Sequence, residues 1–191
     1  MSKTTIAIFV SGSGTNCENI IRHYQDREDV EVGLVVSNRE DAYALVRAKN
    51  HNVPTEVLTR TMLSDEHVVT QCLERYHVNF IVLAGFLLLV PEYLIKRFPR
   101  RIVNLHPALL PKYGGRGMYG HHVHEAVKAA GEKETGITIH YVDAEFDHGT
   151  PIAQHRTPLS SDDTVEDIER KIHVLEQTYF PAAIDLAISR L

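Results

Sequence analysis

Two side chains with complementary chemistry, Asn104 and His106, lie two positions apart in the segment 102–111. The residues around them favour a β-strand, and side chains two apart on a strand point to the same face. Pro107 ends such a strand because it has no N–H for the ladder. An amide and an imidazole side by side at a strand terminus can supply a donor to a developing oxyanion and a carrier for a proton.

The partner that this pair lacks is a carboxylate that would set the charge on His106. Asp147, in the segment 147–151, is the best candidate, because a carboxylate close to an imidazole favours its protonated form. The trio of Asn104, His106 and Asp147 therefore predicts chemistry on an acyl group.

A glycine-containing turn follows the first predicted strand and opens the first predicted helix. Exposed backbone N–H groups, hydroxyls and the positive end of a helix dipole make such a turn suited to a phosphate group. The spacing is neither a dinucleotide-binding fingerprint nor a Walker loop, and a tight turn that needs glycine for its geometry alone is the alternative. The predicted phosphate-binding residues are Gly12, Ser13, Gly14, Thr15 and Asn16.

Short apolar runs alternate with helical patterns over the first 110 residues. The runs are continuous, as in parallel strands buried on both faces, and cover 6–10, 32–36, 80–84 and 102–105. Helices are predicted near 16–27, 41–50, 64–76 and 91–98, the second starting at Asp41 and the fourth with Pro91 in its first turn. This alternation predicts a Rossmann-like α/β fold, an open, mostly parallel twisted sheet with helices on both faces.

The C-terminal third follows a different pattern. Residues 135–142 alternate in polarity and 151–157 can pair with them, which predicts an antiparallel extension of the sheet. A helix with one apolar stripe is predicted from about Thr164, and Pro181 is expected to kink it or to start a new segment. The longest irregular region, 107–120, contains four glycines, and a loop of that length in a compact domain is usually functional or mobile.

Length and composition fit one domain, residues 1–191, with an ordinary globular composition of 43% apolar and 24% charged residues. The net charge of -5 argues against a nucleic-acid-binding protein, whose binding face is usually basic. Cys17 and Cys72 form neither a disulfide framework nor a metal spacing, which favours a reducing cytoplasm. Neither a signal segment nor a membrane-spanning apolar run is recognised, so a cytoplasmic protein without a membrane partner is predicted.

Three further features leave alternatives open. The apolar segment 85–90 follows a strand, at the sheet edge where ligands bind, and would either wall a pocket for a flat aromatic ligand or belong to the core. Histidines cluster at 121–124 without a cysteine or HExxH pattern, so no metal site is predicted. His140 is expected to be a packed or hydrogen-bonded histidine, and Glu176 to be either solvated or directed into a cleft.

Several strings along the chain match one family. The most specific is asparagine-x-histidine-proline followed by leucine-leucine-proline, at 104–111. Further matches lie at 11–16, 37–38, 83–86, 136–142, Asp147 with Gly149, and Glu176 with 179–181. On these residues the chain resembles, over essentially its full length, the phosphoribosylglycinamide formyltransferases of purine biosynthesis, a branch of the folate-dependent formyltransferases.

The resemblance implies transfer of the formyl group of 10-formyltetrahydrofolate to the amine of 5-phosphoribosylglycinamide, without a metal. It implies that Asn104, His106 and Asp147 are catalytic, and that the glycine turn and Glu176 bind the phosphorylated substrate. The partners are then two small molecules, with no nucleic acid, and a homodimer is left open. The implied folate-binding residues are Leu87, Leu88, Leu89, Val90, Asn104, Val142 and Asp143.

Rival functions differ in the acceptor or in accompanying domains. A formyltetrahydrofolate deformylase, the main alternative, would use the same trio with water as acceptor, but such enzymes usually carry an additional N-terminal domain. Methionyl-tRNA formyltransferases add a C-terminal RNA-binding domain. A non-enzymatic nucleotide-binding module leaves the trio unexplained.

The loop 112–124 is longer than in some relatives and is expected to act as a lid.

Overall fold

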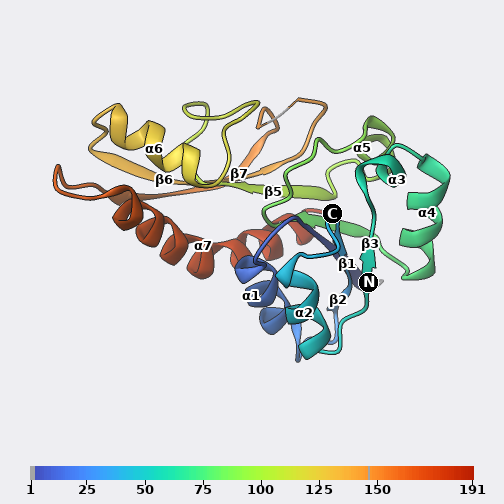
Figure 1. Ribbon diagram of the computed structural model, residues 1–191. Helices are drawn as coiled ribbons and strands as arrows, with labels where there is room; N and C mark the ends of the chain where they lie inside the picture. The colour runs from blue at the N-terminus through green and yellow to red at the C-terminus, as the bar shows by residue number, and fades with distance from the viewer. Residues whose placement is uncertain (1–2, 146) are drawn as a thin grey trace. The chain divides into compact units, whose positions relative to one another are not determined.

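The computed structural model describes residues 3–145 and 147–191 (Figure 1). Two compact units divide the chain between Val103 and Asn104, with Leu191 joining the first unit. The break falls inside strand β5 (Ile102–His106), which begins in the first unit and ends in the second. In hydrogen-bonding order the strands are β3-β2-β1-β4-β5-β6-β7.

The first unit is an α/β unit with parallel strands. β1 pairs in parallel with both β2 and β4, and β2 pairs in parallel with β3. The strands are β1 (Thr4–Val10), β2 (Val30–Ser37), β3 (Thr55–Val57) and β4 (Phe80–Leu83). The helices are α1 (Thr15–Tyr24), α2 (Tyr43–Asn50), α3 (Arg60–Leu63), α4 (Glu66–Arg75) and α5 (Glu92–Arg97).

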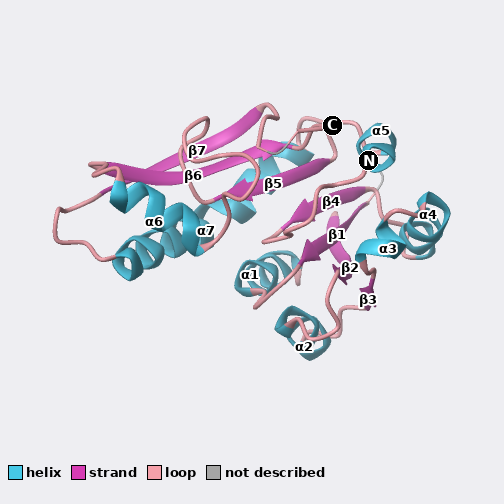
Figure 2. Cartoon of the chain, turned by 45° about the horizontal axis from the view of Figure 1, so that its top comes forward, coloured by secondary structure: helices cyan, strands magenta, loops and turns pink. Residues whose placement is uncertain are grey.

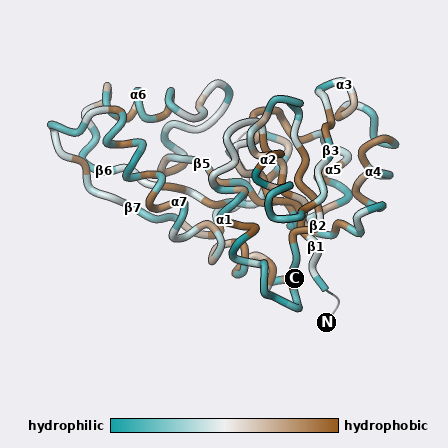
Figure 3. The backbone as a smooth tube through the Cα atoms, turned by 60° about the horizontal axis from the view of Figure 1, so that its bottom comes forward, coloured by the Kyte–Doolittle hydropathy of each residue, from teal (hydrophilic) through white to brown (hydrophobic). Residues whose placement is uncertain are grey.

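Burial on both faces explains the continuous apolar runs of the parallel strands. Every residue from Thr5 to Val10 of β1 and all four residues of β4 are buried. Within this unit α1 packs on α2 and β2, and α3 packs on α4. Figure 3 shows the hydrophobic colour gathered along β1 and β2. The predicted parallel strands are thus confirmed, and their carboxyl ends carry the loops of interest.

Helix boundaries differ from the predicted ones by a few residues. α2 begins at Tyr43 with Ala42 as its N-cap, because Asp41 is instead paired with Arg39 through a two-pronged hydrogen bond. Pro91 is the N-cap of α5 and so precedes its first turn. β3 and the four-residue α3 were not predicted, since three to four residues give no clear period.

The second unit contains the antiparallel part of the sheet. β6 (Glu134–Tyr141) pairs with β7 (Pro151–Pro158) antiparallel, as the alternating pattern predicts. Helix α7 (Val165–Ile188) packs on both strands, and α6 (His121–Ala129) packs on α7 (Figure 2). Ile168 and Ile172 of the predicted stripe are buried under this packing.

Helix α7 excludes one of the two alternatives predicted for Pro181, the start of a new segment. The helix begins with a complete capping box, in which Thr164 and Asp167 satisfy each other's backbone N–H groups. It then continues through Pro181 to Ile188, so no new segment starts there. Proline lacks one helical donor, but tertiary packing commonly overrides that local cost, and Phe180, Pro181 and Ile184 are all buried.

Candidate active site

Strand β5 ends on the predicted pair and brings His106 against Asp147. The His106 side chain is 4% exposed, and its Nδ1 atom lies 3.3 Å from Oδ2 of Asp147, whose side chain is 9% exposed. Both residues belong to the second unit. The structure therefore brings together the imidazole and the carboxylate that the sequence pairs.

The other ring nitrogen of His106 is also occupied. Nε2 lies 2.7 Å from the backbone carbonyl oxygen of Tyr113. A carbonyl and a carboxylate both only accept hydrogen bonds, so both ring nitrogens of His106 must carry protons for both contacts to be favourable. This arrangement suits a buried, positively charged donor of the kind that the trio predicts.

Asp147 is held as an anion by its surroundings. Burial is the largest single influence on the Asp147 carboxyl and would raise its pKa, but the hydrogen bond with His106 and the other contacts of the carboxylate together outweigh burial and hold that pKa well below its usual range. The backbone N–H of Gly115 donates to Oδ2 at 3.0 Å and adds to the effect. Asp147 itself has φ +59°, a left-handed conformation that an aspartate tolerates better than most residues.

Glycine is required two residues beyond Asp147. A Cβ at Gly149 would meet the carbonyl oxygen of Tyr141 at 1.6 Å, so any larger residue would push the Asp147 loop away from β6. The motif around Asp147 is therefore a packing requirement as well as a chemical one.

Asn104 joins the cluster through its amide nitrogen. Nδ2 lies 3.4 Å from Oδ1 of Asp147 and 3.2 Å from Nε2 of His140. His140 is 2% exposed, and its Nδ1 lies 2.8 Å from the carbonyl oxygen of Tyr141. The prediction of a hydrogen-bonded histidine is confirmed, and its place within the catalytic cluster was missed.

Thr138 fixes the chain just beyond the catalytic strand. Its hydroxyl donates to the carbonyl of Ala108 and accepts from the N–H of Leu110 at 3.0 Å. Thr138 and His140 are two apart on β6 and so face the same side, which was the one sequence signal that could have placed His140 in the site. The contributions of the Tyr113 carbonyl and the Gly115 N–H come from the backbone and leave no such signal.

The predicted phosphate turn lies in the first unit, at the start of α1. Gly14 is the N-cap of α1 with φ +77°, and a Cβ there would lie 2.4 Å from the Cβ of Ala44. The first N–H groups of a helix have no partners within it, so they are available to an anion. Gly14 is therefore needed for the geometry of the turn, and this need is compatible with phosphate binding by the same turn.

A partly exposed charge cluster on α1 and α2 supports this turn. Nε of Arg47 donates to the carbonyl oxygen of Ser13 at 2.9 Å, and the same guanidinium pairs with Glu18. His51 lies 3.1 Å from Glu18, and it is the first cause that lowers the pKa of that carboxyl. A cation thus lies beside the turn whether or not a phosphate is bound.

The apolar segment predicted to frame a folate lies in the first unit. Leu87 and Leu89 are each 48% exposed, whereas Val90 is buried. The N–H of Leu87 donates to the hydroxyl of Ser11 at 2.9 Å, which ties this segment to the phosphate turn. Two leucines that are half exposed, with Leu88 between them, do not form a core segment, so the exposure favours the pocket-wall interpretation.

The remaining predicted substrate residues lie in the second unit. Glu176 on α7 has a side chain that is only 15% exposed, with Oε2 3.5 Å from Nδ1 of His173, so it is not simply solvated. Val142 and Asp143 follow β6 and are partly exposed. His124 on α6 is buried, and its Nδ1 has no partner among the described residues.

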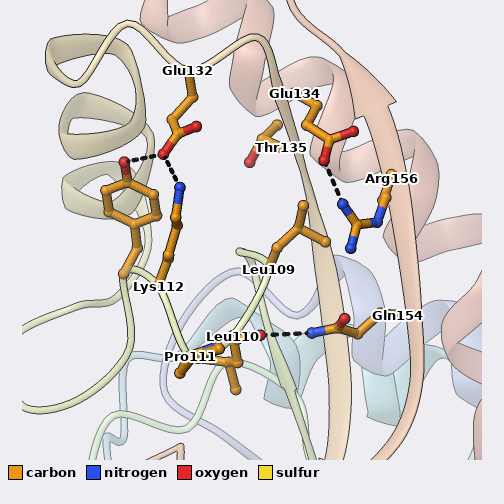
Figure 4. A pocket seen from close by; sticks show the side chains of 10 residues that line it. Leu109, Leu110, Pro111, Lys112, Glu132, Glu134, Thr135, Gln154 and Arg156 are labelled. Carbon is orange, nitrogen blue, oxygen red and sulfur yellow. Dashed lines mark hydrogen bonds and ion pairs between the residues drawn. The ribbon is translucent and has the colours of Figure 1, made fainter.

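A pocket in the second unit lies beside the loop that follows β5, at 109–113, rather than at the trio of Asn104, His106 and Asp147 (Figure 4). Its walls show how that loop is anchored: Glu132 accepts from the Lys112 ammonium and from the Tyr113 hydroxyl, each at 2.8 Å. Gln154 donates to the Leu110 carbonyl at 2.9 Å. These bonds hold the side chain of Tyr113 while its carbonyl faces His106.

Over the described part of the chain, no group of three or more histidine, cysteine, aspartate or glutamate side chains is arranged to hold a metal ion. Two histidines of the segment 121–124 lie beside carboxylates: His121 and His122 pair with Glu125, and His121 also pairs with Glu169. Within the same residues, no helix is long and apolar enough to cross a membrane.

Comparison with known proteins identifies the class. Residues 4–184 match the family model described as formyl transferase, so the chain belongs to the formyl transferase family. Its relatives within this family are phosphoribosylglycinamide formyltransferases. One from Haemophilus influenzae is 34% identical over 184 residues, which cover 94% of this chain and 84% of that protein. These matches place the chain in the phosphoribosylglycinamide formyltransferase branch.

Other matches agree on the branch. A chloroplastic phosphoribosylglycinamide formyltransferase of Arabidopsis thaliana is 37% identical over 87% of this chain, and the chain spans 59% of that plant protein. The fold is also similar to the crystal structure of phosphoribosylglycinamide formyltransferase from Bacillus halodurans. The two chains share 36% sequence identity and superpose with a TM-score of 0.87 over 97% of this chain and 96% of that one. The predicted fold class, a mostly parallel sheet with an antiparallel C-terminal extension, is confirmed by this likeness.

Proposed function

We propose that the chain, acting as a single formyltransferase domain, transfers the formyl group of 10-formyltetrahydrofolate to the amine of 5-phosphoribosylglycinamide. The observation that carries the proposal is His106, buried between the carboxylate of Asp147 and the carbonyl of Tyr113, with the Asn104 amide in the same cluster. An imidazolium donor beside an amide donor is suited to a tetrahedral intermediate formed at a carbonyl.

The reaction follows from these groups. The neutral amine attacks the formyl carbon, a carbon–nitrogen bond forms, and negative charge develops on the formyl oxygen. His106 and Asn104 stabilise that oxygen, each such donor contributing typically about 2.7–4 kcal/mol. The bond to the folate nitrogen then breaks, and the proton lost by the amine passes through water beside Asp147 to the departing nitrogen.

The predicted lid, 112–124, includes the start of α6, and its irregular part, 112–120, is the proposed lid. The Nε2 proton of His106 is donated to Tyr113, so this carbonyl has to leave before the same proton can reach a formyl oxygen. Asp147 is bonded to the same loop through Gly115, which couples loop movement to the trio. Substrate that displaces the Tyr113 carbonyl would replace one acceptor oxygen by another.

The substrates are assigned by chemistry. The turn of Gly12 to Asn16 is proposed to hold the phosphate, and Glu176 the ribose or glycinamide part. Leu87 to Val90, with Asn104, Val142 and Asp143, are proposed to hold the folate. The proposed location is the cytoplasm, supported by two free buried cysteines; burial raises the pKa of Cys17 to about 12.

The test mixes the protein with 10-formyltetrahydrofolate and follows the folate absorbance with and without 5-phosphoribosylglycinamide. Deformylation that occurs only with the amine, with formylated product in equal amount, is the expected result. Equal deformylation without the amine would mean that water is the acceptor, as in a formyltetrahydrofolate deformylase. No change in absorbance under either condition, with both ligands shown to bind, would reject an enzymatic function for these ligands.

A further inference from the structure

The hydrogen bond of His140 with the chain makes its other ring nitrogen an acceptor for the Asn104 amide. Nδ1 of His140 lies 2.8 Å from the carbonyl oxygen of Tyr141, which can only accept, so Nδ1 carries a proton. His140 is only 2% exposed. Its Nε2 is then free to act as an acceptor in the neutral ring.

The amide of Asn104 has two possible orientations, and Asp147 decides between them. The amide atom that lies 3.2 Å from Nε2 of His140 also lies 3.4 Å from Oδ1 of Asp147. If that atom were the amide oxygen, it would face a carboxylate oxygen with no proton between them. The amide nitrogen must therefore occupy this position, with one hydrogen directed to each neighbour.

The two acceptors hold this nitrogen unequally. The contact with His140 is the shorter, and the 3.4 Å contact with Asp147 is beyond the usual range of an N–H···O bond. The two acceptors are not bonded to each other, because Nε2 of His140 lies 3.6 Å from Oδ1 of Asp147, too far for a direct hydrogen bond. The hydrogen directed at Asp147 is thus the one that can turn to another acceptor at small cost.

We propose that His140 is a positioning residue: its unprotonated Nε2 accepts one hydrogen of the Asn104 amide and so keeps the second hydrogen available to the formyl oxygen. The Tyr141 carbonyl fixes the tautomer, and Gly149 leaves room for that carbonyl, since a Cβ at Gly149 would meet the Tyr141 oxygen at 1.6 Å. Without His140, the amide nitrogen keeps only the 3.4 Å contact with Asp147 and is held less firmly in the orientation that donates to the reacting centre. This inference rests on the proposed transfer reaction.

Two substitutions separate the two ends of the His140 ring. His140→Asn keeps a donor near the position of Nδ1, for the Tyr141 carbonyl, and removes the acceptor for Asn104. His140→Gln can place an amide oxygen near the position of Nε2 and so restores that acceptor. The expected result is a fall in kcat of about 10- to 100-fold for His140→Asn, within the loss caused by removing an oxyanion donor, with KM within about twofold. His140→Gln should recover most of kcat.

A cycle with Asn104 tests whether His140 acts through it. In an Asn104→Ala background, His140→Asn should cause no further loss, because the group that it positions is gone. A further loss in that background, or an unchanged kcat for His140→Asn in an enzyme that transfers formyl groups normally, would overturn the assignment. Equal damage by the asparagine and glutamine variants would also overturn it.

The wild-type protein provides a measurement that does not depend on activity. Long-range ¹H–¹⁵N NMR spectra of uniformly labelled protein distinguish the protonated and unprotonated nitrogens of each imidazole, and the His140→Asn spectrum identifies the signals of His140. A neutral ring with the proton on Nδ1 is expected at pH 7. A doubly protonated ring, or a proton on Nε2 alone, would overturn the proposal, whereas lack of transfer by the wild-type protein would instead reject the proposed function.

Discussion

The Nδ1 atom of His106 lies 3.3 Å from Oδ2 of Asp147, with both side chains almost completely buried. This contact, together with the Tyr113 carbonyl at the other ring nitrogen, requires a doubly protonated imidazole. Burial of one charge without the other would be costly. We therefore expect both the proposed catalysis and the stability of the fold to depend on the pair.

Asp147→Asn should lower kcat by about 100- to 1,000-fold, the range found when one oxyanion-stabilising donor is lost, because the neutral amide no longer holds His106 in its charged form. Steady-state kinetics measures this directly. Glu145→Gln is a suitable control, since Glu145 lies in the same loop with a side chain that is 73% exposed. Similar kinetics for the two variants would show that the charge of Asp147 does not matter.

The same variant should change how stability depends on pH. The folded-state pKa of Asp147 is lowered, so its stabilisation is present above its unfolded pKa of about 3.9 and is lost as the pH falls through the folded value. Asp147→Asn should therefore be less stable than the wild type at pH 7, by on the order of 2 kcal/mol. Urea unfolding at pH 7 and below pH 4 tests this. A stability difference that does not shrink in acid would contradict the prediction.

The sequence predicted those parts of the site that are made by side chains at a regular spacing along a strand. Asn104 and His106 were predicted from their spacing of two on a strand, and Asp147 from the need for a carboxylate. Tyr113 and Gly115 contribute backbone atoms, which any residue type carries, so their roles require the loop conformation. His140 shares a face with Thr138, but only the tertiary fold shows that this face is turned toward Asn104.

The fold was predictable for a similar reason. Buried parallel strands and the long helix α7 give strong periodic signals, whereas β3 with three residues does not. Pro181 lies inside α7 because its neighbours Phe180 and Ile184 are buried, and that packing is absent from any local pattern.

Gly14→Ala should destabilise the protein by more than about 1 kcal/mol, because φ is +77° and the new Cβ would collide with Ala44. Gly12→Ala is the matched control in the same turn: nothing lies within 4 Å of its Cβ. Urea unfolding curves should therefore separate the two variants. Equal stability of both would show that the turn is not held by this close approach.

His124 should contribute to loss of stability in mild acid. Burial lowers its pKa, so the unfolded chain takes up a proton at a higher pH than the folded protein, and stability falls as the pH drops below about 6.5. The slope from one such group is at most about 1.4 kcal/mol per pH unit. Unfolding free energies between pH 7.5 and 5.5 should fall less steeply for His124→Gln than for the wild type. His67→Gln, at an exposed site on α4, should leave the slope unchanged, and an unchanged slope for His124→Gln would contradict the prediction.

The most direct test of the central claim is a single-turnover measurement of formyl transfer by the wild type and by His106→Ala, with the affinity for 5-phosphoribosylglycinamide measured by calorimetry on the same samples. The proposed reaction predicts that transfer slows by at least about 100- to 1,000-fold, while the affinity for the phosphorylated substrate changes by no more than about twofold, because the phosphate turn and His106 belong to different segments. An unchanged transfer rate in His106→Ala would contradict the role of His106 as the charged donor to the formyl oxygen.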